Sequence, residues 1–443
     1  MAFRPLLAGA LLLGACVPLS AQTPLPLEAA VARALADNPG LAAAAAAVDG
    51  ATARVDQARA AFLPRVDLVE SWQRGDAPLF AFSALLGARQ VTPADLDTAR
   101  LNDPDPGNFF RAGLLVQQTV FDGGRARGAA RAAALGRDAA AEQLRAARHD
   151  LALQVVRAYA AALLSDARTA AARSALEAAT ADQGRVTARR DAGLATDADT
   201  LAIAAHAADL QARVIQAEAD ADISRARLNR LLGAPLDAAF ALSEPPPPAL
   251  AATALPDALA AADAARPEVR AADLQLSVAR EARAAARAPF LPQVGVQAGY
   301  EWTGRTFADR PASWVVGAEI RWNLLNGGAD RARLAEATAD VTRADALARE
   351  AHAAVAESVQ AARRQLEAAR AREAVGRSAV AQAREAARVT RERYEAGLAS
   401  LTDLLRAATA TLDAETRAAG ARLDVVMTAA LVAHAAGEPL FLP

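Results

Sequence analysis

The chain contains one sequence pattern written twice. Pro39 and Pro267 each begin a helical stretch that ends at Pro64 or Pro292, and both pairs of prolines share a numbering offset of 228. Three later landmarks share an offset of 204 instead: 122–124 and 326–328, 192–196 and 396–400, and 233–235 and 437–439. The first copy therefore carries 24 extra residues between its two blocks. A repeat of this length predicts a fold built from two equivalent halves.

The composition favours long, thin helical layers over ordinary globular domains. Alanine dominates, the basic residues are all arginine, and aromatic residues make up only 4% of the chain. Alanine and arginine are strong helix formers, whereas a thick core needs large side chains. The net charge of −2 gives no reason to expect a nucleic acid as partner.

The first residues have the pattern of a secretory signal peptide, expected over 1–21: Arg4, an apolar run and then small residues. Two processing sites are possible. Cys16 ends a segment that resembles a lipobox, which would make the protein a lipoprotein, and cleavage after Ala21 is the alternative. Cys16 is the only cysteine, so we expect no disulfide. The four histidines lack ligand spacing, and we expect neither a metal nor a cofactor: His149, His206, His352 and His434.

Proline marks the boundaries of the predicted units. The first repeat is expected over 22–236, a proline-rich linker over 237–256 and the second repeat over 257–443. No proline interrupts the two predicted helical hairpins, 125–232 and 330–436. The long helix of the first hairpin, about 66 residues, would extend about 100 Å at 1.5 Å per residue. Helices of about 22 and 36 residues would match it when stacked end to end, as in a wall of full-length rods.

The second half contains two predicted strands, 293–302 and 314–324, in which polar and apolar residues alternate strictly. Aromatic residues lie at their ends, which is typical of an outer-membrane barrel strand. An antiparallel sheet with one buried face is the alternative, but the rest of the chain offers only helices to cover that face. The candidate lipid-facing residues are Val294, Val296, Tyr300, Trp302, Trp314, Ile320 and Trp322.

The predicted strands of the first half, about 65–74 and 110–121, alternate less cleanly. Glu70 and Gln118 fall on the face that should be apolar. The 24 surplus residues lie between these strands, in 76–108, where an apolar patch adjoins turns rich in Asp and Pro. Such a barrel varies in length at its extracellular loops, and a solvated lid or a receptor site is expected there.

The turn of each predicted hairpin contains residues that account for the end of one helix and the start of the next. Gly193 and Gly397 end a helix in the role of a left-handed residue. Thr196 and Ser400 then begin the next helix as N-caps, with an acidic residue three positions later to complete a capping box, Asp199 and Asp403 respectively.

Together these features resemble the outer membrane efflux protein family, whose prototype is TolC. The resemblance extends over about 27–439 and rests on the duplication, two strand pairs, two long hairpins, Phe-Leu-Pro before the strands and Gly-Leu-Ala-Thr/Ser at the tips. It implies a mainly helical, duplicated chain that assembles as a homotrimer. Three chains would form one α-helical barrel across the periplasm and one shared 12-stranded β-barrel in Gram-negative outer-membrane lipid.

The resemblance also implies partners and a gate. A periplasmic adaptor (membrane fusion) protein and an inner-membrane pump would deliver the cargo, which is small molecules (drugs, toxic compounds or metal ions) or proteins. Asp403 matches an acidic residue at the prototype's periplasmic constriction, whereas Arg406 stands where the prototype has a second aspartate. The gate candidates are Asp403 and Arg406 on the second tip, with Asp199 and either Arg190 or Arg189 on the first.

Two other classes of function compete with an export duct. A secreted structural or adhesive coiled-coil protein would explain the helices but would have no use for alternating strands with aromatic ends. An enzyme would need a site, and the sequence has no paired-carboxylate cleft, phosphate loop or nucleophile–base signature. We therefore expect no catalytic activity.

Overall fold

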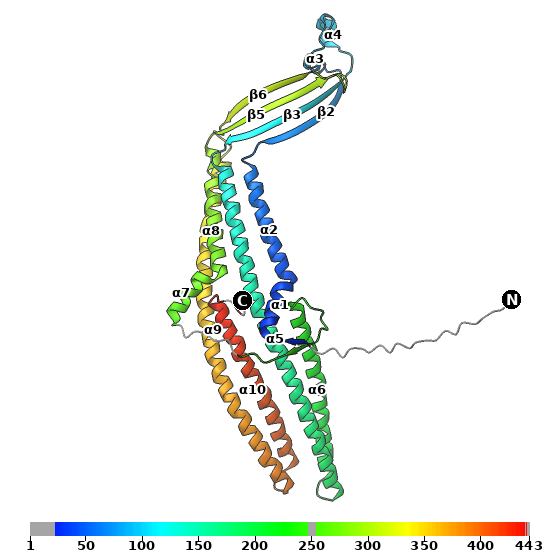
Figure 1. Cartoon of the computed structure of the whole chain (residues 1–443), viewed down its shortest axis with the longest axis vertical. Helices are drawn as coiled ribbons and strands as arrows, with labels where there is room; N and C mark the ends of the chain where they lie inside the picture. The colour runs from blue at the N-terminus through cyan, green and yellow to red at the C-terminus, as the bar shows by residue number, and fades with distance from the viewer. Residues whose placement is uncertain (1–22, 247–253, 439, 441–443) are drawn as a thin grey trace, which may run out of the picture.

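The computed structural model describes residues 23–246, 254–438 and 440 (Figure 1). The predicted signal peptide, with Cys16, and part of the predicted linker lie outside these residues. The described chain is long and thin: a four-stranded sheet lies at one end, two helical tips lie at the other, and short elements surround the middle (Figure 1).

Two helical hairpins of equal size form the body. In the first, α5 (Arg125–Asp191) and α6 (Asp197–Leu231) contain 67 and 35 residues. In the second, α9 (Ala329–Glu395) and α10 (Leu401–Ala435) also contain 67 and 35. At 1.5 Å per residue each long helix spans roughly 100 Å. The matched lengths agree with the constant offset between the hairpin landmarks of the two halves.

The shorter helices pack along the parts of the long helices that their hairpin partners leave open, as the predicted helix lengths indicate. α2 (Pro39–Ala60) packs along the part of α5 that α6 leaves open, and α8 (Pro267–Ala285) packs against α5 and α9 (Figure 1). α1 (Leu27–Asp37) and α7 (Leu255–Ala265) precede them at the middle of the molecule. Each of α2 and α8 begins with a proline, which suits a first helical turn because its missing N–H needs no partner there.

The largest hydrophobic core lies at the middle of the first half. Tyr159 of α5 is its largest fully buried side chain, and its hydroxyl donates to the carbonyl oxygen of Leu25 at 2.8 Å. The same hydroxyl accepts from the main-chain N–H of Ser243 at 2.9 Å. These bonds hold two short parallel strands against the core, β1 (Thr23–Leu25) and β4 (Phe240–Leu242). β4 lies inside the segment predicted as a linker, so that segment is partly a strand.

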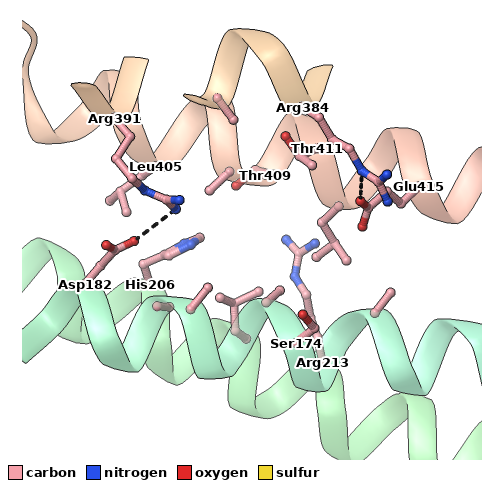
Figure 2. A pocket seen from close by; sticks show the side chains of 18 of the residues that line it. Ser174, Asp182, His206, Arg213, Arg384, Arg391, Leu405, Thr409, Thr411 and Glu415 are labelled. Carbon is pink, nitrogen blue, oxygen red and sulfur yellow. Dashed lines mark hydrogen bonds and ion pairs between the residues drawn. The ribbon is translucent and has the colours of Figure 1, made fainter. Parts of the chain in front are cut away.

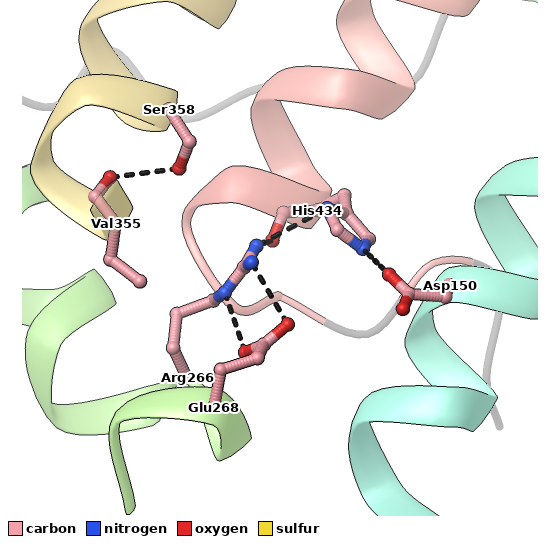
Figure 3. A network of polar contacts seen from close by, with 6 residues as sticks. All are labelled: Asp150, Arg266, Glu268, Val355, Ser358 and His434. Carbon is pink, nitrogen blue, oxygen red and sulfur yellow. Dashed lines mark hydrogen bonds and ion pairs between the residues drawn. The ribbon is translucent and has the colours of Figure 1, made fainter. Parts of the chain in front are cut away.

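A polar network joins three helices at the same level (Figure 3). Arg266, just before α8, makes a bidentate ion pair with Glu268 and donates to the carbonyl oxygen of His434 on α10. His434 in turn contacts Asp150 of α5, with 3.0 Å between Nε2 and Oδ1. The network therefore links the second half of the chain to the long helix of the first.

The segment 76–108 contains three short helices in addition to the predicted turns: α3 (Pro78–Gly87), a 3₁₀ helix (Pro93–Leu96) and α4 (Thr98–Asn102). They lie beyond the loop end of the sheet (Figure 1). α3 contains the apolar patch noted in the sequence, and its Leu79 is 83% exposed. Among the described helices only α10 is long and apolar enough to cross a bilayer, and it instead packs against α9 and α5.

Candidate functional site

The four-stranded sheet consists of β2 (Arg65–Gly75), β3 (Gly107–Phe121), β5 (Gln293–Gly304) and β6 (Ala312–Arg321), in the order β2-β3-β5-β6. All neighbours are antiparallel. β3 and β5 come from different halves of the chain and lie side by side at the centre of the sheet. The two strand pairs thus form one continuous surface.

The ladder places the predicted apolar residues of the second half on one face. Val294 pairs with Ile320, Val296 with Ala318, and Tyr300 with Trp314. Paired residues of an antiparallel ladder point to the same side, so these side chains form one surface. The first half extends the same face through Val66, Leu68 and Trp72 on β2 and Ala112, Leu114 and Val116 on β3.

No described helix covers this face (Figure 1). Trp314 is 74% exposed, Ile320 73% and Leu68 73%. A contiguous exposed apolar surface on a folded protein marks a partner or a membrane. Aromatic residues gather near both ends of the strands: Trp72, Tyr300, Trp302 and Trp314 at the loop end, and Phe62, Phe121, Phe290 and Trp322 at the helix end. Girdles of this kind flank the apolar band of outer-membrane barrels.

Trp322 is not part of the strand, contrary to the prediction that the strand extends to 324. β6 ends at Arg321, which pairs with Gln293 as the last rung of the ladder. Pro292 precedes Gln293 and has no N–H to donate, so the ladder stops there. The Trp322 indole instead donates to the carbonyl oxygen of Phe290 at 3.2 Å.

The opposite face of the sheet is mainly polar. Glycines and glutamines alternate with charged residues along β5 and β6. Three ion pairs lie on this face: Arg111–Glu301 at 2.7 Å, Arg65–Asp67 at 2.8 Å and Arg321–Glu319 at 2.7 Å. Such a face is suited to contact with water, and the sheet therefore has one polar and one apolar side.

The two polar residues that interrupt the apolar face have partners. The Glu70 carboxylate pairs with Arg310, in the loop between β5 and β6, at 2.6 Å. The Gln118 side-chain amide donates to the carbonyl oxygen of Phe62 at 3.2 Å, beyond the helix end of the sheet. Their local partners explain why the first-half strands alternate less cleanly than those of the second half.

The outer strands of the sheet have unpaired edges. β2 pairs only with β3 and β6 pairs only with β5 among the described residues. Four antiparallel strands are too few to close into a barrel, and the free edges leave main-chain N–H and C=O groups without partners. The sheet of one chain is thus an open fragment.

The tips show the turn geometry that the motif predicts. Gly193 and Gly397 have φ values of 74° and 76°, in the left-handed region. At the first tip the Asp199 carboxylate accepts from the Thr196 N–H at 2.9 Å and hydroxyl at 2.8 Å. At the second tip Asp403 accepts from the Ser400 hydroxyl at 2.7 Å and N–H at 3.2 Å.

These capping bonds lower the pKa of both carboxyl groups. The pKa of Asp199 lies below its ordinary value mainly because its carboxylate accepts from the main-chain N–H of Thr196. The bond from the Thr196 hydroxyl has the second largest effect. The pKa of Asp403 is lowered mainly by the hydrogen bond from the Ser400 hydroxyl and next by the bond from the Ser400 N–H. The positive charge of Arg406 also lowers it. Each carboxylate is therefore both a cap and a fixed negative charge at its tip.

The two candidate arginines take separate positions. Arg190 makes an ion pair with its neighbour Asp191 at 2.5 Å and does not reach Asp199. Arg406 lines a surface hollow that also contains Asp403, without an ion pair among the described residues. The structure therefore does not bring the four gate candidates into one cluster within a single chain.

The two tips are linked by contacts whose partners the sequence did not reveal. Arg189 donates to the carbonyl oxygen of Glu395 at 3.2 Å and lies over the ring of Tyr394, 5.2 Å from its centroid. A small apolar cluster beside it combines residues from all four helices or their turns: Val186, Ile203, Leu401 and Leu404, with Tyr394. Such contacts join residues from the two halves of the chain, and local sequence carries no signal for them.

A third link lies nine residues before the end of α5, between two and three turns from the tip. The buried carboxylate of Asp182 makes an ion pair with Arg185 of the same helix and lies 3.9 Å from Arg391 of α9. No group of three or more potential metal ligands occurs among the described residues.

The comparisons with known proteins match this architecture. A family model described as outer membrane efflux protein matches residues 30–234 and 258–438, one segment in each half. The resemblance stated from the sequence is therefore confirmed, and the coiled-coil alternative is not supported. None of the curated proteins compared with the chain matches it significantly.

Several solved structures share the fold. The outer membrane protein VceC from Vibrio cholerae is 22% identical, with a TM-score of 0.77 over 94% of this chain and 96% of that one. The Campylobacter jejuni CmeC outer membrane channel is 18% identical, with a TM-score of 0.78 over 93% and 85%. The Neisseria gonorrhoeae MtrE outer membrane channel, solved in its open state, is 20% identical, with a TM-score of 0.72 over 94% and 89%. By its family match the chain belongs to the outer membrane efflux proteins.

Proposed function

We propose that three copies of this chain form a continuous export duct through the outer membrane. The observation that carries the proposal is an open sheet with one bare apolar face and two unpaired edges on an otherwise helical chain. In lipid every main-chain polar group needs an internal partner, so strands can span a membrane only in a closed barrel. Three chains would supply twelve strands, three times four, and leave no edge.

The two faces of the sheet would meet different surroundings in such a barrel. The apolar face with Val296, Ala318 and Ile320 would contact lipid, and the face with Glu301 and Glu319 would line the water-filled lumen. The two hairpins of each chain would continue the lumen as a helical wall across the periplasm. Cargo would enter from an inner-membrane pump through a periplasmic adaptor, and the pump would supply the driving force.

The tips would form the gate of this duct. Around a threefold axis, Asp403 and Arg406 of each chain would meet the tips of the other two, together with Asp199 and Arg190. Exposed ion pairs contribute only about 0–1 kcal/mol each, so a ring of them closes a passage and still yields to an adaptor's contacts. Links within a chain, such as Arg189 to Tyr394 and Arg391 to Asp182, would hold its two hairpins together as they move.

Engineered disulfides between the free edges test the shared barrel. One cysteine replaces Asp67 on β2 and a second replaces Val315, Gly317 or Glu319 on β6, one pair at a time to sample the unknown register. Two strands separate β2 from β6 within a chain, roughly 14 Å at 4.8 Å per step, which is too far for a disulfide. We expect at least one pair to give covalent trimers on oxidised gels. Monomers only, for every pair, would contradict the shared barrel.

A further inference from the structure

A cavity of about 300 Å³ lies between the two hairpins, in the part of the molecule near the tips (Figure 2). Its walls come from α5, α6, α9 and α10, so all four helices of the body meet around it. The volume is at the lower end of the range for small-molecule sites in proteins. A tip cluster described above, with Val186 and Leu404, closes the side toward the tips.

Small and apolar side chains account for the space. The wall formed by α5 is made largely of alanines, including Ala171, Ala175 and Ala178, which leave room that larger residues would fill. Leucines from the other hairpin and from α6 give the cavity an apolar lining: Leu210, Leu405 and Leu412. A ligand with a hydrocarbon or aromatic body would be accommodated by these walls.

The charge of the lining is positive. Four arginines and two carboxylates, Asp182 and Glu415, line the cavity. Arg384 is neutralised by Glu415 at 2.7 Å. Arg388 is paired with two glutamates of its own helix, Glu385 and Glu392. Each of these two arginines therefore has a carboxylate partner.

The other two arginines, Arg213 and Arg391, have guanidinium nitrogens without a hydrogen-bond partner among the described residues. Arg213 of α6 makes an ion pair with Asp209 through its Nε at 2.9 Å, and its two terminal guanidinium nitrogens have no hydrogen-bond partner among the described residues. Arg391 of α9 lies 3.9 Å from Asp182, a carboxylate already held more closely by Arg185. Figure 2 shows both guanidinium groups directed into the cavity from opposite walls.

We propose that this cavity binds a small organic anion, a carboxylate or sulfonate with a compact apolar body. The anionic head would accept from Arg213 and Arg391, because a guanidinium presents paired N–H groups that match these oxyanions. The body would lie against the leucines. A bound ligand touches both hairpins, so its affinity depends on how closely they approach, and it favours the arrangement that holds them together.

The proposal is tested with 2-naphthalenesulfonate as the probe, titrated by calorimetry into the full-length protein in phosphatidylcholine nanodiscs, with empty nanodiscs as blank. We expect saturable binding to the wild type, weakened about tenfold or more by Arg213→Gln and by Arg391→Gln, the loss expected for one charge-assisted hydrogen bond. Arg213→Lys, which keeps the charge, should bind more tightly than Arg213→Gln.

Arg349→Gln is the matched control. Arg349 of α9 makes an ion pair with Asp345, four residues before it, as Arg213 does with Asp209, but it lies outside the cavity. This variant should bind like the wild type, and circular dichroism should show equal helix content in all variants. Equal binding by Arg213→Gln, Arg391→Gln and the wild type would overturn the proposal. Equal binding of uncharged 2-naphthalenemethanol, or no saturable binding of the sulfonate, would do the same.

Discussion

The guanidinium group of Arg266 donates to the main-chain carbonyl oxygen of His434 at 2.7 Å and so connects the start of α8 to the end of α10 (Figure 3). The same nitrogen lies 3.2 Å from Nδ1 of the His434 ring. A guanidinium can only donate, so Nδ1 accepts and the ring hydrogen is on Nε2, where it is donated to Asp150. This bond lowers the pKa of Asp150 below its ordinary value.

The first half makes the equivalent link with a neutral side chain. Asn38, which precedes Pro39 as Arg266 precedes Pro267, donates to the carbonyl oxygen of Leu231 at the end of α6, at 2.9 Å. Its side-chain oxygen also caps α2 by accepting from the N–H of Gly40. Both halves thus close the same junction, but only the second uses a buried charge.

We predict that Arg266→Ala costs more stability than Asn38→Ala. Loss of the guanidinium leaves the Glu268 carboxylate without its ion pair and Nδ1 of the buried His434 ring without its donor, a loss of about 2–4 kcal/mol. Asn38→Ala removes one neutral bond and one cap, about 1–2 kcal/mol. Urea unfolding followed by circular dichroism compares the two variants. An equal or larger loss for Asn38→Ala would refute the role assigned to the buried charge.

A second histidine predicts a dependence on pH. His352 of α9 lies 2.5 Å from Asp263 of α7 and 3.6 Å from Asp273 of α8, and the hydrogen bond to Asp263 raises its pKa. The resulting stabilisation is present in full below the unfolded pKa of about 6.5 and is lost as pH rises through the folded value. We expect the melting temperature to fall less between about pH 6 and pH 8.5 in His352→Gln than in the wild type.

His206→Gln provides the control for this measurement, because His206 lines the cavity and has no ion pair among the described residues. It should keep the wild-type difference in melting temperature between the two pH values. A wild-type difference that persists in His352→Gln would show that the contact with Asp263 does not carry the effect.

The two faces of the sheet predict opposite responses to a charge. Ala318→Arg places a cation on the apolar face, and in mid-bilayer this costs about 2–4 kcal/mol. Gly317→Arg places it on the polar face, where an added Cβ meets only the Gln297 side chain at 3.9 Å. The yield of assembled protein from outer membranes should fall in the first variant and stay near wild type in the second. Equal yields would mean that the apolar face does not contact lipid.

The tips predict a change in conductance that separates the charge from the cap. Asp403→Asn removes the negative charge but keeps an oxygen that can accept from Ser400. If the charge helps to close the duct, the purified protein should conduct more in planar bilayers. Ser400→Ala removes the cap and keeps the charge, and it should lower stability by about 1 kcal/mol with little change in conductance. Equal increases for both variants would exclude a separate gating role for Asp403.

Much of the fold follows from local sequence. Proline spacing and the capping motifs at Gly193 and Gly397 locate the hairpins, because helix ends depend on nearby residues. Alternation locates the strands for a similar reason. The end of β6 depends instead on Pro292, which lies just before the partner strand β5, and this explains the error at Trp322. β4 is not predicted from the sequence, because three residues are too few to show an alternating pattern. Its partner strand, β1, also lies more than 200 residues earlier in the chain.

The candidate site was less accessible to sequence. Arg189, rather than Arg190, connects the two tips, and Arg391 reaches Asp182 from the other hairpin. Each of these residues belongs to a long helix with many arginines on its surface, and only the packing of α5 against the second hairpin selects which of them meet. The capping residues were predicted because a capping box is complete within four positions.

The mass of the protein extracted from membranes shows directly whether three chains share one barrel. Size-exclusion chromatography with light scattering, corrected for bound detergent, should give three times the mass of one chain, and circular dichroism should show much helix with some strand. This result is predicted because only several chains together close the sheet. A monomer recovered in soluble form from the periplasm, with none in the membrane fraction, would contradict the shared barrel.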